Sequence, residues 1–523
     1  ERSWRKYRSF SSDGMTPSIP RCSRPTLVLV SDGEVPNATG RLTALVEGQL
    51  IPFGGDQFVK VSADLASQFV EGDRLVVVQN SGDLIRIEES VARLVDEAVS
   101  QAVTGFERLA STSSDVVDSF YDQFARLLSE DEIFAHVRSA NQEDVEAARR
   151  RGRAIGRLEL SEKMRHDMIE ALRMWRDLPD PFEGSVELIA HENWTVEERR
   201  SPLGVIGFVF EGRPNVFADA TGVLKSGNSV VFRIGSDALL TARSLMEHCV
   251  RPACELTGLA RECVTLVDAA ERSAGHALFS DTRLALAVAR GSGEAVAQLG
   301  SVARQSGVPV SLHGTGGAWM HVAAGVAPDR ILKVVDASLD RKVCNTLNVV
   351  AVAKSAEVER SAVLSGILSA ASRRDVRPIV HLRRAEARVW GISEPEVDVV
   401  LHDDDSFLAT EWEWDDRPEV SVITVSDADE TVVLFNGHSP KFVLSILTED
   451  PDELERVYRT SEAPFVGDGF TRWVDGQYAL SRPELGLSNW QTGRLFGRGG
   501  ILSGDGVFSV RHLARHRDPG QRR

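Results

Sequence analysis

Val205-Ile-Gly-Phe-Val-Phe210 opens the stretch of sequence that decides the fold. Three further apolar runs of strand length follow it: Ser229-Val-Val-Phe232, Cys263-Val-Thr-Leu-Val267 and Leu284-Ala-Leu-Ala-Val288. Continuous apolar runs are typical of parallel strands that are covered on both faces. Helical patterns over residues 239–257 and 293–305 fit the crossover connections between them. The alternation predicts an α/β fold with a doubly wound sheet, which binds nucleotides at the carboxyl ends of its strands.

Other patterns extend on both sides of this stretch. A second α/β pattern begins near residue 328, with strands predicted at residues 349–353, 420–425 and 443–447. Upstream, apolar residues at helical spacing predict helices that begin near Glu89 and that cover residues 116–128 and 161–175.

Residues 25–90 are predicted to form a small β-rich module. Strands are expected at residues 26–30, 58–61 and 74–78, and glycine-containing turns such as Gly54-Gly55 separate them. The sequence of this module suggests no chemistry of its own.

Residues 1–24 are basic and rich in serine, and they show no apolar periodicity. Targeting segments share this composition. We favour a disordered start upstream of Met15, an interpretation that leaves organelle targeting open.

Length, charge and cysteine content exclude several classes of protein. A chain of 523 residues is too long for one core and suggests about three domains. No apolar run approaches the ~20 residues that span a bilayer, so no membrane association is expected. A net charge of −17 argues against nucleic acid as a partner. Cysteines are few and form no C-x-x-C pair, which favours the reducing cytoplasm and predicts no metal site: Cys22, Cys249, Cys254, Cys263 and Cys344.

Cys344 is the candidate nucleophile. It lies in the run Asp340-Arg-Lys-Val-Cys-Asn-Thr-Leu-Asn348, directly before the apolar stretch 349–353. A polar, partly basic loop favours the thiolate, which is the form of cysteine that attacks a carbonyl. Lone cysteines are also common as small core residues, so the loop by itself leaves both interpretations open.

Three glycine-bearing turns follow strands of the first α/β unit, at residues 211–215, 233–236 and 290–293. Arg233 and Ser236 at a helix start suit a phosphate, although turn chemistry alone also explains such glycines. Asn215 follows a strand end, where its amide could donate to a developing oxyanion. An asparagine after proline is also a common turn residue.

Several separated motifs resemble the γ-glutamyl phosphate reductase (glutamate-5-semialdehyde dehydrogenase) family of the aldehyde dehydrogenase superfamily. They are Arg200-Ser-Pro-Leu-Gly-Val-Ile-Gly-Phe-Val-Phe-Glu-Gly-Arg-Pro-Asn215, Leu224-Lys-Ser-Gly-Asn-Ser-Val-Val-Phe-Arg233, Val343-Cys-Asn345, Leu447-Thr-Glu-Asp450, Phe470-Thr-Arg-Trp-Val-Asp-Gly476 and Glu484-Leu-Gly-Leu-Ser488. The resemblance covers roughly residues 116–512. It implies NADPH-dependent reduction of an activated carboxylate, here L-glutamyl 5-phosphate to the semialdehyde of proline biosynthesis.

The resemblance also implies roles for individual residues. Cys344 would form a thioacyl-enzyme, and Asn215 with the backbone amide of Cys344 would hold the oxyanion. Arg233, Gly235, Ser236, Gly291 and Gly293 would meet the nucleotide, and Glu413 or Asp415 would approach its ribose. Arg213, Asn345 and Asn348 are the candidate substrate-binding residues.

The resemblance implies a division of the chain as well. Residues 91–327 would form the nucleotide-binding domain with its N-terminal helices, and residues 328–460 the catalytic domain. Residues 461–523 would return to the nucleotide domain, and within them residues 471–488 would contribute to subunit contacts in a homodimer or homotetramer.

Two positions depart from the family pattern. Asn348 stands where the family has an acid, and Pro440 follows His438-Ser439 where the family has another. A site that binds an ammonium group needs such acids, so their loss suggests a less polar acyl phosphate or acyl thioester as an alternative substrate. A kinase, ligase or carrier partner would then deliver the activated acid. A non-catalytic scaffold is the remaining alternative, and it would not bind NADPH.

Overall fold

The computed structural model describes residues 40–153, 155–156, 158–210, 212–291, 293–314, 316–392, 395–473, 476–486, 490–491, 494–495 and 502–520. The chain divides into two units, Glu1–Leu42 and Thr43–Arg523, and all the features below belong to the second. The basic segment 1–24, with Cys22, and the strand predicted at residues 26–30 lie outside the described residues.

The β module consists of two antiparallel hairpins and a short helix. The hairpins are β1 (Leu50–Phe53) with β2 (Gln57–Lys60) and β3 (Arg74–Val77) with β4 (Leu84–Ile87). Strands β2 and β3 lie where the sequence predicted them. Helix α1 (Ala63–Gln68) was not predicted, because none of its residues is buried and it has no apolar stripe.

Four long helices follow the module: α2 (Glu89–Leu109), α3 (Ser114–Ser129), α4 (Asp131–Arg150) and α5 (Glu162–Asp177). The sequence predicted α2, α3 and α5, whose apolar residues recur at helical spacing. At the start of α5, Ser161 Oγ accepts a hydrogen bond from Met164 N, at 3.2 Å. Helix α4 has fewer apolar residues and was not predicted.

The predicted doubly wound sheet is confirmed. Its five strands are parallel, in the order β11-β10-β7-β8-β9. The strands are β7 (Val205–Phe210), β8 (Ser229–Ile234), β9 (Val264–Leu266), β10 (Leu284–Arg290) and β11 (Val310–His313). The helices between them are α6 (Val216–Ala220), α7 (Leu239–Leu245), α8 (Arg251–Thr257), α9 (Ser273–Phe279) and α10 (Gly293–Gln305), with a π-helical turn (Met246–Val250) between α7 and α8.

Alternate residues of each strand face opposite sides of this sheet and feed two separate cores. Phe208 and Phe232 join a core with α3, α5 and α8, whereas Val209 and Val231 join a core with α2, α9 and α10. Both faces are therefore covered, as the continuous apolar runs predicted.

The second sheet has seven strands in the order β15-β14-β16-β13-β12-β17-β18, and all its pairings are parallel. The strands are β12 (Ala318–Val322), β13 (Leu347–Ala353), β14 (Ile379–Arg383), β15 (Asp398–His402), β16 (Glu419–Val425), β17 (Val443–Leu447) and β18 (Phe465–Gly467). The helices are α11 (Pro328–Ser338), α12 (Glu357–Ser372), α13 (Ala387–Trp390), α14 (Ala428–His438) and α15 (Pro451–Thr460). Because β12 pairs with β13 and β17, this sheet begins ahead of the boundary predicted at residue 328.

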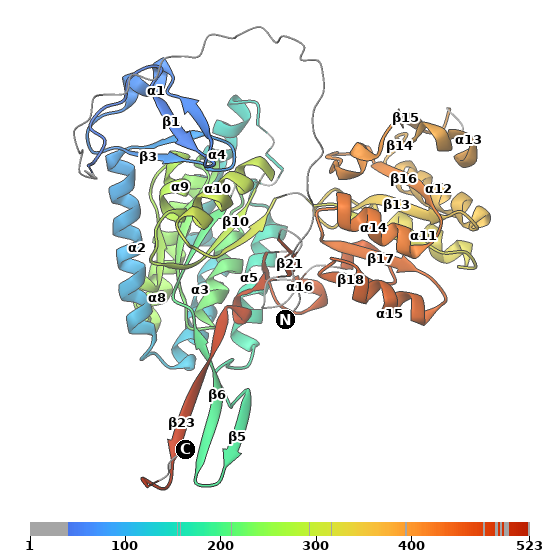
Figure 1. The fold of residues 1–523 in the computed structure, drawn as a ribbon. Helices are drawn as coiled ribbons and strands as arrows, with labels where there is room; N and C mark the ends of the chain where they lie inside the picture. The colour runs from blue at the N-terminus through green and yellow to red at the C-terminus, as the bar shows by residue number, and fades with distance from the viewer. Residues whose placement is uncertain are drawn as a thin grey trace, which may run out of the picture. The chain divides into compact units, whose positions relative to one another are not determined.

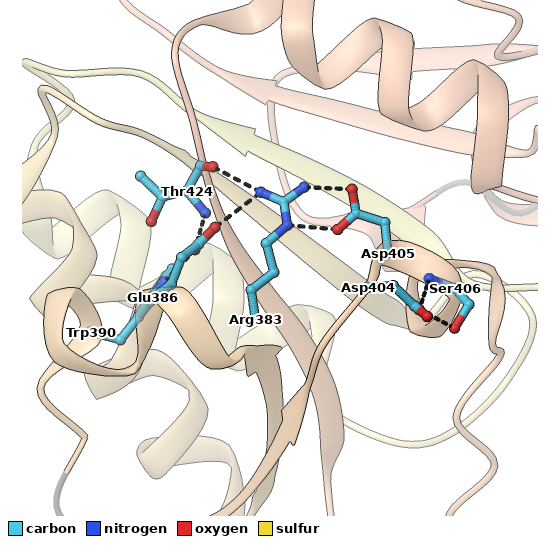
Figure 2. A network of polar contacts seen from close by, with 7 residues as sticks. All are labelled: Arg383, Glu386, Trp390, Asp404, Asp405, Ser406 and Thr424. Atoms are coloured by element: carbon cyan, nitrogen blue, oxygen red, sulfur yellow. Dashed lines mark hydrogen bonds and ion pairs between the residues drawn. The ribbon is translucent and has the colours of Figure 1, made fainter.

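A polar network fixes the carboxyl end of β14 (Figure 2). Arg383 donates to both carboxylate oxygens of Asp405, at 2.7 and 3.0 Å, and to Glu386 at 2.9 Å. Glu386 also accepts from Thr424 N, at 2.6 Å, and so ties β14 to β16. The network anchors the start of a short helical turn (Asp405–Ala409), which leads directly into the segment around Glu411.

A three-stranded antiparallel sheet is exposed along most of its length (Figure 1). It has the order β23-β6-β5 and consists of β5 (Glu187–His191), β6 (Trp194–Pro202) and β23 (Phe508–His516). Subunit contacts were predicted instead for residues 471–488. In the described part of that segment, β19 (Glu484–Gly486) contacts β10 and β11 of the nucleotide-binding sheet.

The remaining described elements near the C-terminus are short. They are a helical turn (Thr471–Trp473), α16 (Gly476–Ala479), β20 (Trp490–Gln491), β21 (Arg494–Leu495), β22 (Leu502–Ser503) and a helical turn (Gly504–Gly506). Across the described part of the chain, no helix combines the length and the apolar character that a membrane crossing requires.

Candidate active site

One large cleft follows the carboxyl ends of the nucleotide-binding strands and reaches Cys344. Its volume is about 1080 Å³. Most of the residues predicted to act on nucleotide or substrate line it: Arg213, Arg233, Gly235, Ser236, Gly291, Gly293, Cys344 and Glu413. Loops at this edge of a parallel sheet form the ligand crevice in doubly wound folds.

Cys344 lies in a loop that its own backbone and Thr346 hold in place. Thr346 Oγ1 donates to the carbonyl oxygen of Arg341, at 2.6 Å, and accepts from Val343 N, at 2.8 Å. The carbonyl oxygen of Cys344 accepts from Gly317 N, at 2.7 Å. These hydrogen bonds hold the loop that carries the thiol at the edge of the cleft.

The glycine-rich link between β11 and β12 brings the two halves of the site together. A Cβ on Gly316 would lie 2.6 Å from Cys344 Cα, and a Cβ on Gly314 would lie 2.9 Å from Gly293 Cα. Neither position tolerates a side chain without movement of the backbone that it touches. Gly314 thus abuts the nucleotide loop at Gly293, and Gly316 abuts the nucleophile loop, so the link between β11 and β12 contacts both loops.

The charges that act on Cys344 are not those that the sequence suggested. Burial raises the pKa of the thiol, and the carboxylate of Glu484 raises it further. The guanidinium groups of Arg290 and Arg213 oppose this rise. The loop's own Lys342 is ion-paired with Glu411, and their side chains are only 5% and 11% exposed. The prediction that the basic loop favours the thiolate is therefore wrong, because Glu411 compensates Lys342 and the cations that lower the pKa lie outside the loop.

Glu411 is a site residue that the sequence did not reveal. Its carboxylate accepts a hydrogen bond from Gly316 N as well as pairing with Lys342, and it lines the cleft. Glu413, which was predicted, also lines the cleft but is 60% exposed and lies 3.9 Å from Lys342. Asp415 is exposed and is not part of the lining. Four acids within residues 411–416 gave no local signal that distinguishes the buried one.

Three predicted amide side chains make contacts within the protein instead of lining the cleft. Asn215 Nδ2 donates to Asp219 Oδ2, at 2.9 Å, and Asn345 accepts from the guanidinium of Arg472. Asn348 is buried, donates to Thr410 O at 2.8 Å and accepts from Trp412 N at 3.0 Å.

Both ends of the Asn348 amide tie β13 to the segment that carries Glu411. Asn348 is not among the residues that line the cleft, and its contact with substrate stays a prediction. Pro440 also lies outside the residues that line the cleft.

The nucleotide end of the cleft is rich in arginine. Six arginines line the cleft, against three carboxylates: Arg86, Arg153, Arg213, Arg233, Arg272 and Arg290, with Asp237, Glu411 and Glu413. Arg151 and Arg153 both pair with Asp237, so this carboxylate is compensated. Arg233 is oriented by a hydrogen bond to Glu271 O, at 2.8 Å. A cleft of this size with more arginines than carboxylates fits a nicotinamide dinucleotide.

Sequence comparisons agree with this architecture. The aldehyde dehydrogenase family model matches residues 76–359. A gamma-glutamyl phosphate reductase of Erythrobacter litoralis is 30% identical over 357 residues, covering 66% of this chain and 78% of that protein. Gamma-glutamyl phosphate reductase 2 of Bacillus licheniformis is 26% identical over 426 residues, covering 79% of this chain and 94% of that protein.

Solved structures show the same fold. Gamma-glutamyl phosphate reductase of Thermotoga maritima superposes with a TM-score of 0.71 at 22% identity, covering 82% of this chain and all of that one. An acetylating aldehyde dehydrogenase of Geobacillus thermoglucosidasius gives a TM-score of 0.59 at 14% identity, covering 83% and 99%. The chain therefore belongs to the aldehyde dehydrogenase family of oxidoreductases and, within it, to the gamma-glutamyl phosphate reductases.

Proposed function

We propose that this protein reduces an activated carboxylate to an aldehyde through a thioester on Cys344, with NADPH as the reductant. The observation that carries the proposal is a thiol at the edge of a cleft that it shares with the nucleotide loops at Gly235 and Gly293. Covalent attachment next to a nucleotide site is what a thioacyl reduction requires.

The reaction begins at the thiol. The Cys344 thiolate attacks the carbonyl carbon, and the phosphate or thiol leaving group departs with the bonding electrons, which leaves a thioester. NADPH, when bound, would supply a hydride to the thioester carbonyl carbon. Cys344 would then leave as the thiolate as the carbon–sulfur bond breaks and the aldehyde is released.

Backbone and side-chain donors stabilise the oxyanion formed in both addition steps. The proposed donors are the Cys344 amide and Asn215 Nδ2. In the structure one N–H of Asn215 Nδ2 donates to Asp219, and its second N–H is the proposed donor to the oxyanion. Removal of one oxyanion donor typically slows a reaction about 100- to 1000-fold.

NADPH is favoured over NADH by the charge of the cleft. The compensated Asp237 presents little repulsion to a 2′-phosphate, and the surplus of arginines attracts it. Arg233 and Ser236 are the proposed contacts from the first nucleotide loop, and Gly291 and Gly293 those from the second.

L-Glutamyl 5-phosphate is the proposed substrate, in line with the names of the relatives. The argument for a less polar acid rested on Asn348 and Pro440, which do not line the cleft, and Asn348 is occupied by internal hydrogen bonds. Arg213 lines the cleft near the thiol and suits the carboxylate or the phosphate of the substrate.

The reverse reaction tests both the mechanism and the substrate. Purified protein is given NADP with inorganic phosphate, or with coenzyme A, and a panel of aldehydes, while NADPH absorbance is followed. We expect oxidation of glutamate 5-semialdehyde that depends on phosphate. Activity confined to aliphatic or aromatic aldehydes would replace this substrate with the less polar alternative.

The assembly and its surroundings are part of the proposal. A homodimer or homotetramer would cover the sheet of β5, β6 and β23, whose outer strands β5 and β23 have no further partner strand in the described part of the chain. Light scattering at micromolar concentration should give a multiple of the 57.2 kDa chain mass. The described cysteines are all free, which fits a cytoplasmic enzyme. The proposed supplier of its acyl phosphate is a kinase.

A further inference from the structure

Part of the wall of the cleft comes from outside the nucleotide-binding sheet and its helices. Leu84, Ile85 and Arg86 of strand β4 line it, beside Val296 and Leu299 of α10. These three residues belong to the β module, whose sequence shows no nucleotide motif. The module therefore takes part in the cleft instead of standing apart from it.

Side chains along α10 hold the β3–β4 hairpin in this position. They recur at a spacing of three and four residues, which places them on one face of the helix: Gln298, Ser301 and Gln305. Their partners are Asp83 Oδ2 (3.0 Å from Gln298 Nε2), Asn80 Oδ1 (2.7 Å from Ser301 Oγ) and Val77 O (2.7 Å from Gln305 Nε2). The hairpin is thus attached along the length of the helix.

These contacts lie away from the nucleophile. Helix α10 begins at Gly293, which abuts Gly314 near the Cys344 loop. At a rise of 1.5 Å per residue, Gln298 and Gln305 lie about 8 and about 18 Å further along the helix. Because the nicotinamide ring must reach the thioester, the hairpin borders the part of the cleft left for the other half of the dinucleotide.

The chemistry of the hairpin suits that half. Ile85 offers an apolar surface to a purine, with Val296 and Leu299 beside it, whereas Leu84 packs against the module's own core. Arg86 Nε donates to Asp73 Oδ2, at 2.6 Å, and the side chain of Asp73 is only 2% exposed. Glu88 lies 3.5 Å from Arg86 Nη1. A guanidinium fixed from behind can still present its outer N–H groups to a phosphate.

A hydrogen-bond chain links the module to a second wall of the cleft. Asp83 only accepts, so the Gln298 amide turns its nitrogen to Asp83 and its oxygen to His276 Nε2, at 3.1 Å. The proton on that imidazole nitrogen then points to Gln298. Both Gln298 and His276 line the cleft, so the module also sets the orientation of two cleft side chains.

We propose that the β module is a working part of the cofactor site, in which the β3–β4 hairpin encloses the adenosine end of NADPH. Ile85 covers the purine, and Arg86 recognises the 2′-phosphate. The inference rests on the proposed function, because it takes NADPH as the ligand.

Hydrogen exchange on the unaltered protein tests the contact without relying on activity. Each half of the cofactor is added separately, as 2′,5′-ADP or as nicotinamide mononucleotide. We expect 2′,5′-ADP and NADPH to slow exchange in residues 79–88, and nicotinamide mononucleotide to leave these residues unchanged. Slowed exchange at residues 235–238 and 293–299 without any change at 79–88 would overturn the inference and leave the proposed function standing. No binding of NADPH would overturn both.

A binding measurement separates the phosphate contact from the purine contact. The variant R86M/D73N removes the cation together with its buried partner, so that no unpaired charge remains. We expect it to bind 2′,5′-ADP at least about tenfold more weakly, and to change binding of adenosine 5′-monophosphate much less. The control is R93M, which removes an exposed arginine of α2. Equal affinities in a folded R86M/D73N variant and the unaltered protein would refute the role of Arg86, and the exchange experiment decides the case if this variant does not fold.

Discussion

The nucleotide loops and the nucleophile loop differ in how well their residues could be assigned. Arg233, Gly235, Ser236, Gly291 and Gly293 lie in turns after predicted strands, the family resemblance assigned them to the nucleotide, and all of them line the cleft. The amides predicted around Cys344 instead bond to other parts of the protein. Turns after parallel strands are placed by the backbone topology, whereas a side-chain amide takes whichever partner the tertiary fold brings near. Backbone-defined sites are therefore the more predictable of the two.

The thiol itself gives the largest expected effect. Cys344→Ala should abolish acyl-enzyme formation and turnover, while NADPH still quenches fluorescence, because the nucleotide loops do not depend on the thiol. Among the described cysteines Cys344 alone is partly exposed, so alkylation should label it first in the unaltered protein. Cys263→Ala, at a buried cysteine, is the matched control and should retain turnover. Unchanged turnover of Cys344→Ala would rule out the thioester.

Asn215 tests whether an amide that contacts Asp219 in the structure still serves the reaction. Asn215→Ala should slow acylation about 100- to 1000-fold with little change in thermal stability, because it removes one oxyanion donor. Burst kinetics and a melting curve on the same variant separate this role from a turn role. Acylation should be faster in the Asp219→Ala variant than in the Asn215→Ala variant. A large fall in melting temperature with normal acylation would assign Asn215 to the fold.

Replacing Glu411 tests how its ion pair with Lys342 affects the loop that carries Cys344. Glu411→Gln leaves Lys342 buried without its carboxylate, which costs about 3–5 kcal/mol of unfolding free energy. Loss of this negative charge, with Lys342 uncompensated, should also lower the pKa of Cys344, so its alkylation should begin at lower pH. Denaturant unfolding and alkylation rates against pH measure the two effects.

Two variants act as controls for Glu411. The double variant K342M/E411Q should regain most of the lost stability, since no unpaired charge remains. Glu413→Gln, at a carboxylate that is largely exposed, should change little. Equal effects of Glu411→Gln and Glu413→Gln would contradict the special position of Glu411.

Replacing Asn348 by aspartate tests whether its amide serves the fold or stands where an acid would bind the substrate. Asn348→Asp removes the donor to Thr410 O and sets a carboxylate against a carbonyl, which should cost about 1–3 kcal/mol of stability without improving binding of glutamate 5-semialdehyde. Asn436→Asp is the matched control, because Asn436 has the same pattern of one donated and one accepted bond at a more exposed site. A lower KM for the semialdehyde in Asn348→Asp would restore the predicted substrate role.

His321, on strand β12, affects only how stability depends on pH. Burial lowers its pKa to about 4, below the ordinary 6.5, and it contacts Thr431 Oγ1 at 2.7 Å. Between pH 6.5 and 4 the unfolded chain binds a proton that the folded chain refuses, so stability falls as the pH falls through this window. His321→Gln should flatten this dependence by up to about 3 kcal/mol, measured by urea unfolding at each pH. His512→Gln, at an exposed histidine of β23, should leave the dependence of stability on pH unchanged.

The sequence by itself determined the fold and the main parts of the site. Apolar runs such as Val205–Phe210 require two covered faces wherever they fold, so they predicted the parallel sheet and hence the edge at which ligands bind. The motifs around Cys344 and Asn215 identified the family, and the resemblance predicted Cys344 as the nucleophile. These features depend on residues that are neighbours in sequence, which is why they could be recognised without coordinates.

Only the tertiary structure decided which charges and amides meet. Glu411 reaches Lys342 across 69 positions of sequence, and Gln298 reaches Asp83 across 215. The role of the β module was hidden for the same reason, since Arg86 lines a cleft formed by strands more than a hundred residues away. A side chain's ionisation and hydrogen bonding depend on distances of a few ångströms between such remote residues, and those distances are set only when the elements pack.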